Sequence, residues 1–195
     1  MNKLVQQIKN NMSSLKPLQL TLAILKPDVV SRPHIIHQIK GLILNNGFYF
    51  IKSTRCYLPR SIAEEFYKEH EGRFFHNRLV TFMSSGHVSA HVLAKQDAIS
   101  SWRKLMGPTK VLKTVHEEPH SIRGRFGLTD TRNATHGSDS VESARREIHF
   151  FFPDFNIEEW YKDEEIHFRM GHVKYCEDKN EHVLDEYQIL NAAQE

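Results

Sequence analysis

Cysteine is scarce in this sequence: Cys56 and Cys176 are its only two, they lie far apart, and no C-x-x-C motif occurs. This scarcity excludes a C-x-x-C metal site and makes a reducing compartment the simplest interpretation. Long apolar runs are also absent, because none approaches the ~18 residues that a membrane-spanning helix requires. Neither sign of charge dominates, since 26 basic and 24 acidic side chains leave a formal net charge of +2. That balance argues against a dedicated nucleic-acid-binding protein, which would show a strong basic excess.

The N-terminal segment, residues 1–17, lacks acids altogether, and the first acidic residue of the chain is Asp28. The apolar residues of this segment fall on one helical face: Leu4, Val5, Ile8, Met12 and Leu15. A basic, amphipathic and acid-poor segment is typical of a mitochondrial presequence, whereas its modest length and lack of Arg fit a disordered cytosolic lead-in. Both alternatives stay open, so the expected location is the mitochondrion (matrix) or the cytoplasm.

The length of 195 residues suits one domain with tails. Compact apolar runs predict strands over residues 18–25, 48–58 and 88–94, and a short fourth strand is expected near residues 133–136. Helical spacing predicts helices between the strands, with start signals at Pro33, at a Ser61/Glu64 capping box and at Asp97. A second helix over residues 74–83 would place Phe74, Phe75, Leu79, Phe82 and Met83 on one apolar stripe.

This order of elements is that of a split β-α-β unit. It predicts an α+β, ferredoxin-like βαββαβ antiparallel sheet with helices on one face. The segment 109–120 has no clear period and is expected to be a loop. The chain after Trp160 is polar, so an irregular and partly disordered extension over residues 161–195 is expected, with a short helix within 184–193. The predicted domain boundaries are therefore 1–17, 18–160 and 161–195.

One stretch, Thr131 to Ser140 (T-R-N-A-T-H-G-S-D-S), carries the chemistry that the sequence suggests. His136 precedes Gly137, which lets a backbone or a ligand come close to the imidazole, and Asp139 with Glu142 is a helix-capping pair. A neutral imidazole nitrogen is a nucleophile towards phosphorus when its other nitrogen is held by an acceptor. Ser138 and Glu147 are available for that acceptor chain. A lone histidine among 13 is by default a surface or core residue.

Three motifs in order change that weighting: A-I-L-K-P-D at 23–28, S-I-R-G at 121–124 and N-x-x-H-G-S-D at 133–139. Over about Leu20 to Phe155 the chain resembles the nucleoside diphosphate kinase family. The finer pattern, including E-H-E-G-R-F-F at 69–75 and L-M-G-P-T at 105–109, most resembles its divergent type-six branch. The family has the ferredoxin-like fold, so pattern and resemblance agree.

The resemblance implies a set of site residues. Lys26, Arg103, Thr109 and Arg123 match phosphate and ribose contacts, Asn133 matches a ribose-side contact, and Tyr67 matches a tyrosine near the transferred phosphoryl group. Phe75 matches the aromatic residue on which the base stacks, with Leu79 beside it, and stacking tolerates every base. His136 matches the nucleophile, Glu147 the carboxylate that holds its other nitrogen, and Ser138 the group that orients Glu147. Arg125 and Arg132 match nothing and are expected to be solvated.

Each of these residues taken singly has an ordinary structural interpretation, in the core or in a surface ion pair. Their joint presence at matching positions favours the functional one. The resemblance then implies nucleoside diphosphate kinase activity: ping-pong transfer of a γ-phosphate through phosphohistidine at His136, with Mg²⁺ held mainly by the nucleotide phosphates and no protein metal ligand. The chain lacks the G-x-x-x-x-G-K-[ST] loop and the H-R-D and D-F-G motifs of other phosphotransferases.

Two departures from the ordinary family pattern bear on activity and assembly. Asp130 stands where the family usually has a small apolar residue, near the base end of the nucleotide. The segment 109–120 is longer than in ordinary members, where this loop packs between subunits of a hexamer. A competing hypothesis is therefore a weakly active or silent member that acts through a protein partner. Nucleic-acid binding is a third hypothesis, which the near-neutral charge supports poorly.

Overall fold

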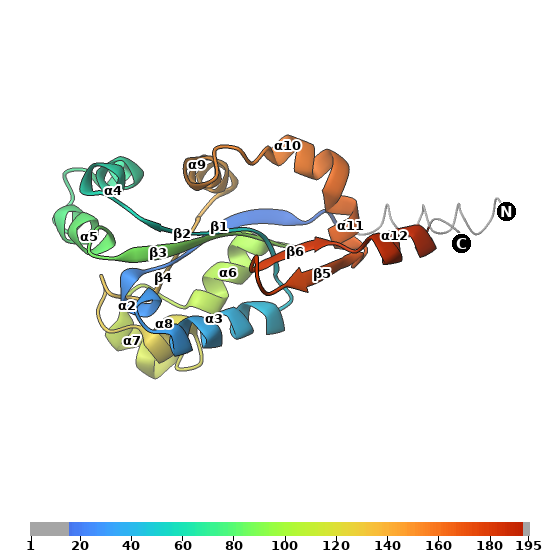
Figure 1. Cartoon of the computed structure of the whole chain (residues 1–195). Helices are drawn as coiled ribbons and strands as arrows, with labels where there is room; N and C mark the ends of the chain where they lie inside the picture. Colours follow the sequence, from blue (N-terminus) through green and yellow to red (C-terminus); the bar gives the residue numbers. More distant parts are fainter. Residues whose placement is uncertain (1–15, 193–195) are drawn as a thin grey trace.

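A four-stranded antiparallel sheet organises the computed structural model, which describes residues 16–192 (Figure 1). Its strands are β1 (Gln19–Leu25), β2 (Tyr49–Tyr57), β3 (His87–Lys95) and β4 (Thr135–Gly137). They lie in the order β2-β3-β1-β4, with β1 paired to both β3 and β4. The predicted ferredoxin-like α+β sheet is confirmed. The predicted N-terminal presequence or lead-in lies almost entirely outside the described residues.

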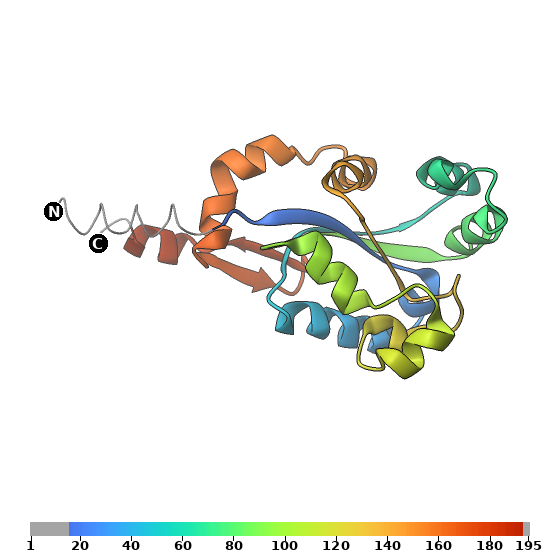
Figure 2. The ribbon, with the colours of Figure 1, turned by 180° about the vertical axis from the view of Figure 1, so that it is seen from behind.

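Both faces of this sheet are covered, as the layers in Figures 1 and 2 show. The two crossover helices, α3 (Pro33–Asn45) and α6 (Ala98–Met106), pack with Ala23 and Leu25 on one face, where helices were expected. The opposite face holds α4 (Arg60–Phe66), α5 (His76–Met83) and α9 (Val141–Phe151) against Leu22 and Ile24. The prediction of helices on one face is therefore corrected. The physical reason is that β1 buries alternate side chains on both of its sides.

Several helix ends differ from their predicted start signals. Helix α4 begins at Arg60 with no side-chain cap, so the Ser61/Glu64 capping box is wrong. Its inward side chains are Ala63 and Phe66, whereas Ile62 is 37% exposed. Helix α9 is capped by Ser140, whose Oγ accepts from the Ser143 N–H at 3.0 Å, and not by Asp139.

The Phe74 side chain leaves the predicted apolar stripe, because 88% of it is exposed. It lies before α5, in the segment that follows the 3-10 helix η1 (Lys68–His70). Phe82 and Met83 of α5 are buried as expected.

Most of the segment 109–120 is a helix and not a loop. Helix α7 (Val111–Glu117) buries Val111 and Thr114, and α8 (Ile122–Phe126) follows it. The Asp130 carboxylate accepts from the Val111 N–H at 3.0 Å, at the start of α7. This contact comes from a residue distant in sequence, which explains why local periodicity missed the helix.

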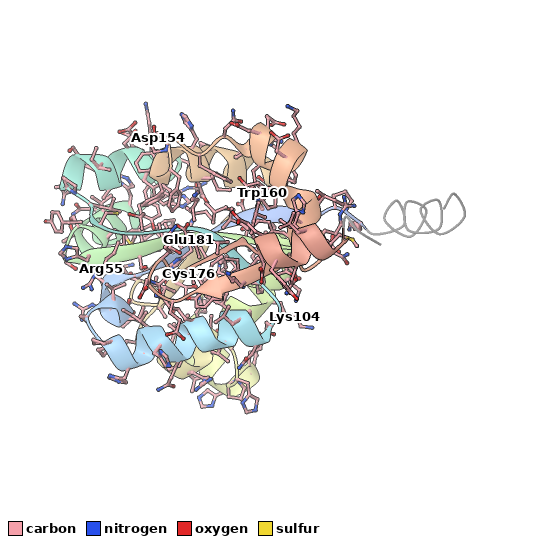
Figure 3. All side chains as sticks on the ribbon, turned by 45° about the vertical axis from the view of Figure 1, so that its right-hand side comes forward. Arg55, Lys104, Asp154, Trp160, Cys176 and Glu181 are labelled. Atoms are coloured by element: carbon pink, nitrogen blue, oxygen red, sulfur yellow. The ribbon has the colours of Figure 1, made fainter. Side chains whose placement is uncertain are left out.

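Up to Ala192 the C-terminal extension consists mostly of regular elements, so the prediction of an irregular tail is wrong for the described residues. After α10 (Ile157–Glu159) come the π-helix η2 (Trp160–Glu164), α11 (Glu165–Arg169), a hairpin of β5 (Val173–Cys176) and β6 (Glu181–Leu184), and α12 (Glu186–Ala192). Helix α12 confirms the short helix predicted within 184–193. Trp160 and Phe168 lie in the same buried cluster as Leu20. Figure 3 shows Trp160 above the hairpin residues Cys176 and Glu181. Within residues 16–192, no helix is long and apolar enough to cross a membrane.

Candidate active site

A cavity of about 570 Å³ gathers the residues that the sequence singled out. Every predicted site residue except Ser138 lines it: Lys26, Tyr67, Phe75, Leu79, Arg103, Thr109, Arg123, Asn133, His136 and Glu147. Ser138 is fully buried directly behind Glu147. Residues spread over more than 120 positions of the sequence thus line one cavity, because the fold brings the elements that carry them together.

His136 lies on β4, and one of its ring nitrogens is fixed by a carboxylate. Its Nε2 atom lies 3.1 Å from Oε1 of Glu147, on α9. Burial alone would raise the pKa of Glu147, but the hydrogen bonds from His136 and Ser138 and the charge of His136 outweigh that effect and lower it. An ionised carboxylate accepts only, so Nε2 carries the proton. The Nδ1 atom has no hydrogen-bond partner among the described residues and is left with its lone pair.

Ser138 fixes the carboxylate in turn. Its Oγ donates to Oε2 of Glu147 at 2.7 Å and accepts from the backbone N–H of Leu22, on β1, at 3.2 Å. The central strand therefore positions the serine, the serine positions the carboxylate, and the carboxylate positions the imidazole. Such a chain sets both the tautomer and the direction of a histidine ring.

A strained turn just before His136 aims the short strand β4. Ala134 has φ +67°, in the left-handed region that residues with a Cβ avoid, and the Thr135 N–H donates to the Asn133 carbonyl at 2.7 Å. Asp28 Oδ2 accepts from the Ala134 N–H at 3.1 Å, and the Lys26 N–H donates to the Ala134 carbonyl at 2.9 Å. Asp28 was missed as a site residue, although its place in K-P-D was the available signal.

Gly137 has a different role from the one expected. A Cβ atom there would lie 2.4 Å from Cδ1 and Nε1 of Trp102, so the glycine makes room for an indole and not for a ligand. The Trp102 Nε1–H donates to the His136 carbonyl at 3.2 Å. This contact anchors β4 to helix α6.

Two buried cations face the cavity, and neither is in hydrogen-bond contact with an acidic side chain among the described residues. Lys26 Nζ donates to Asn133 Oδ1 at 2.7 Å, and burial together with the charge of Arg123 lowers its pKa to about 7. Arg123 donates to the carbonyls of Gly107 at 2.8 Å and Thr135 at 3.0 Å, while its Nε is buried with no partner in the described chain. Burial and the charge of Arg103 lower the Arg123 pKa to about 10. Two cations held close together and partly desolvated favour an anionic ligand.

Part of the cavity lining is aromatic and apolar. Phe75 and Leu79 are half-buried there, and Phe75 contacts the ring of His70 at a centroid distance of 5.4 Å. The Tyr67 hydroxyl is buried with no hydrogen-bond partner in residues 16–192, and burial and the charge of Glu147 raise its pKa. Lining residues that the sequence did not indicate are Glu69, His70, Phe74, Arg78, Met106, Lys110, Thr131, Thr135 and Asp139.

The remaining predicted residues lie at the rim. Arg103 and Thr109 are exposed, and the Thr109 hydroxyl accepts from Arg123 at 3.4 Å. Arg125 and Arg132 are exposed, as predicted. Asp130 lines the cavity, but one of its carboxylate oxygens is engaged at the start of α7.

The geometry agrees with comparison to known proteins. The family model described as "Nucleoside diphosphate kinase" matches residues 19–157. The chain belongs to the nucleoside diphosphate kinase family. The domain that carries the kinase family's pattern ends before η2, so the π-helix, the hairpin and α12 lie beyond it.

Relatives in the type-six branch match over most of their length. The chain is 51% identical over 173 residues to "Nucleoside diphosphate kinase 6" of Danio rerio, covering 89% of this chain and 98% of that protein. It is 51% identical over 171 residues to the Homo sapiens protein of the same name, covering 88% and 92%. The resemblance to the type-six branch is confirmed.

Solved structures of the kinase family share the fold. The nucleoside diphosphate kinase of Aquifex aeolicus has a TM-score of 0.66 and 39% identity, covering 69% of this chain and 95% of that one. The apo enzyme of Encephalitozoon cuniculi has a TM-score of 0.65 and 32% identity, covering 73% and 99%. Nearly whole kinase chains therefore correspond to about seven-tenths of this chain.

Proposed function

We propose that this protein is a nucleoside diphosphate kinase that transfers the γ-phosphate of a nucleoside triphosphate to a nucleoside diphosphate by a ping-pong mechanism through phosphohistidine at His136. The observation that supports it best is the orientation of one imidazole. Its Nε2 is bound to Glu147, and its ring lines a cavity that also holds Lys26 and Arg123. A nucleophile and anion-binding groups therefore line the same cavity.

The first half-reaction forms an N–P bond and breaks a P–O bond. His136 Nδ1 attacks the γ-phosphorus in line, and the bond to the β-phosphate oxygen breaks, so a nucleoside diphosphate leaves. Glu147 stabilises the positive charge that develops on the ring through its contact with Nε2–H. In the second half-reaction a different diphosphate enters and its terminal oxygen attacks the phosphorus. A P–O bond forms, the N–P bond breaks with its electron pair returning to Nδ1, and His136 is neutral again.

The donor set of the cavity fits a metal that travels with the nucleotide. In the described part of the chain, no group of three or more His, Cys, Asp or Glu side chains is placed to hold a metal ion. The cavity offers cationic and amide donors such as Lys26, Arg123 and Asn133, which suit phosphate oxygens. Carboxylates also line it, but among the described residues they form no such group that could hold a metal ion. We therefore assign Mg²⁺ to the phosphates of the nucleotide, where it would neutralise charge that develops during transfer.

The aromatic and apolar part of the lining explains how one site serves many nucleotides. Phe75 offers an aromatic face and Leu79 an apolar one, and the π-face of any base stacks on such a surface. The polar contacts then fall on the phosphates and the ribose, which all nucleotides share. Base selectivity is expected to be weak.

The test is labelling of the protein by a γ-labelled triphosphate. Incubation with γ-labelled ATP and Mg²⁺ should give an acid-labile phosphoprotein, and His136→Ala should abolish the label. His149→Ala is the matched control, because His149 is exposed on α9 outside the cavity and its loss should leave labelling unchanged. Label that survives in His136→Ala, or vanishes equally in the control, would contradict the proposed nucleophile.

The competing function is a weakly active or silent member that acts through a protein partner. One observation favours it: α7, the helix in the lengthened segment, leaves Leu112 83% and Val115 40% exposed on its outer side. Well-folded protein that takes no label alone, and takes label only with a partner present, is the outcome that selects this alternative.

A further inference from the structure

We call the cavity around His136 the nucleotide cavity. A second cavity, of about 550 Å³, shares a wall with it. The common wall is the segment 128–133: Leu128 and Arg132 line the second cavity, and Asp130, Thr131 and Asn133 line the first. Helix α2 (Pro27–Val30), the end of β2 and the start of β3 complete the second cavity. We call it the arginine cavity, because Arg32, Arg55 and Arg132 all line it.

The guanidinium groups of this cavity have unused donors. Those of Arg55 and Arg132 make no hydrogen bond or ion pair with any described residue, and Arg132 lies 5.9 Å from the centre of the Phe82 ring. Arg32 uses Nε to donate to the Asp28 carbonyl at 2.8 Å, while one of its terminal nitrogens is buried with no partner in residues 16–192. Three guanidinium groups face one carboxylate, an excess of two positive charges. Planar guanidinium donors suit phosphate oxygens.

The single carboxylate of the cavity is also incompletely used. Asp28 Oδ2 accepts from the Ala134 N–H, but Oδ1 is buried with no hydrogen-bond donor in the described chain. A buried carboxylate oxygen without a donor gains from any O–H or N–H group that a ligand supplies. A cationic donor would be repelled by the three arginines, so a neutral hydroxyl is the donor that fits beside them. A ligand for this cavity therefore combines a phosphate, for the arginines, with a hydroxyl, for Asp28.

We propose that the arginine cavity is a second binding site, which takes a phosphorylated sugar or a larger molecule that contains one. The volume, close to that of the nucleotide cavity, suits a small molecule. An acidic peptide would satisfy the arginines but would leave Asp28 Oδ1 beside another carboxylate, so the small ligand is favoured.

The two cavities are linked through the strained turn. Asp28 lines the arginine cavity, and its Oδ2 accepts from the Ala134 N–H. Ala134 is two residues before His136, and its carbonyl accepts from the Lys26 N–H. An occupant that binds Asp28 therefore acts on the turn that aims the reactive histidine.

The test is a calorimetric titration of the full chain with ribose 5-phosphate as the probe, at fixed ionic strength. The double variant R55Q/R132Q should weaken binding by about tenfold or more, as two charge-assisted contacts are lost. The control R125Q/R145Q removes two exposed arginines that do not line the arginine cavity, with the same change in net charge, and should bind as the unaltered protein does. Inorganic phosphate should bind more weakly than ribose 5-phosphate, because it offers no sugar hydroxyl to Asp28.

Three results would overturn the proposal. Equal weakening in both double variants would mean general charge attraction. Binding that survives in R55Q/R132Q and is lost in R103Q would place the probe in the nucleotide cavity. No binding of the probe, together with polyglutamate binding that only R55Q/R132Q weakens, would assign the cavity to an acidic peptide. Labelling of His136 in R55Q/R132Q without the probe should stay normal, so this test and that of the kinase activity fail separately.

Discussion

The nucleotide cavity and the hairpin of the C-terminal extension differ in how they treat polar groups. In the cavity, the Tyr67 hydroxyl and Arg123 Nε are buried with no partner in the described chain. In the extension, the hairpin supplies partners to the edge strand β2. The Phe50 N–H donates to His182 Nδ1 at 2.9 Å, and the Ser53 N–H donates to Glu181 Oε1 at 2.8 Å.

This difference separates a binding region from a structural one. Unpaired buried donors are costly, so a cavity that retains them is stabilised when a ligand supplies acceptors. An edge strand with free backbone N–H groups can pair with another chain. In β2, the N–H groups of Phe50 and Ser53 donate instead to side chains of the hairpin. The comparison predicts that changes in the extension alter stability, while changes at the cavity alter chemistry.

The largest effect is expected in the extension. Trp160 is 2% exposed and lies just beyond the segment that matches the kinase family model. The substitution Trp160→Ala should lower the free energy of unfolding by about 3–5 kcal/mol. Tyr187→Ala, at a side chain 74% exposed on α12, should change stability by less than about 0.5 kcal/mol. Urea unfolding measures both. Equal effects of the two substitutions would mean that the extension is not part of the core.

The next effect is expected on chemistry alone. Glu147→Gln keeps the shape of the side chain but removes the charge that stabilises the His136 ring during transfer. Labelling by γ-labelled ATP should slow by about 10²-fold. Glu142→Gln, at an exposed glutamate on the same helix, should label at the normal rate. A Glu147→Gln protein that labels normally would remove the carboxylate from the mechanism.

A smaller effect concerns protons. Because the Lys26 pKa is lowered to about 7, the amine is largely neutral at pH 8, and a bound polyphosphate should raise that pKa. Nucleotide binding at pH 8 should therefore take up as much as about one proton, seen as a dependence of the binding enthalpy on the buffer. Lys26→Met should remove the uptake. Binding that is independent of buffer would contradict a neutral Lys26.

The same lysine gives a stability prediction with a definite sign. In the unfolded chain Lys26 keeps its ordinary pKa, so between pH 7 and 10.5 the unfolded state binds more protons than the folded one. The Lys26 contribution to stability should rise with pH across that window. Comparing the unfolding free energy of the protein with that of Lys26→Met isolates it.

The smallest effect is expected at the hairpin. His182→Ala removes the acceptor of the Phe50 N–H and should cost about 1–2 kcal/mol of stability at neutral pH. Labelling per folded molecule should be unchanged, and His149→Ala should be neutral. A large loss of labelling with normal stability would show that the hairpin reaches the chemistry.

The sequence predicted what local patterns determine. Strand β1 came from a continuous apolar run, which also signals burial on both faces and was the clue to helices on each side of the sheet. The residues around His136 form a motif of local spacing, and the resemblance to the kinase family assigned their roles. Asp28 acts on the turn from 106 positions away, and this role follows only from the folded chain.

What the sequence did not predict depends on distant contacts. Helix α7 is short and has few buried side chains. The N–H of its first residue, Val111, donates to the Asp130 carboxylate. The hairpin is polar, and its side chains are fixed by the backbone of β2, more than 120 residues earlier. Neither element has enough apolar periodicity of its own to be recognised.

The most direct test of the account is the position of phosphorus on the imidazole of His136. Because Glu147 holds Nε2, the transferred group should bond to Nδ1, and ³¹P–¹⁵N correlation spectra of the phosphorylated protein with labelled histidine distinguish the two nitrogens. The account predicts phosphorus on Nδ1 of His136 in the unaltered protein and no signal in His136→Ala. Phosphorus on Nε2, or on another residue, would contradict it.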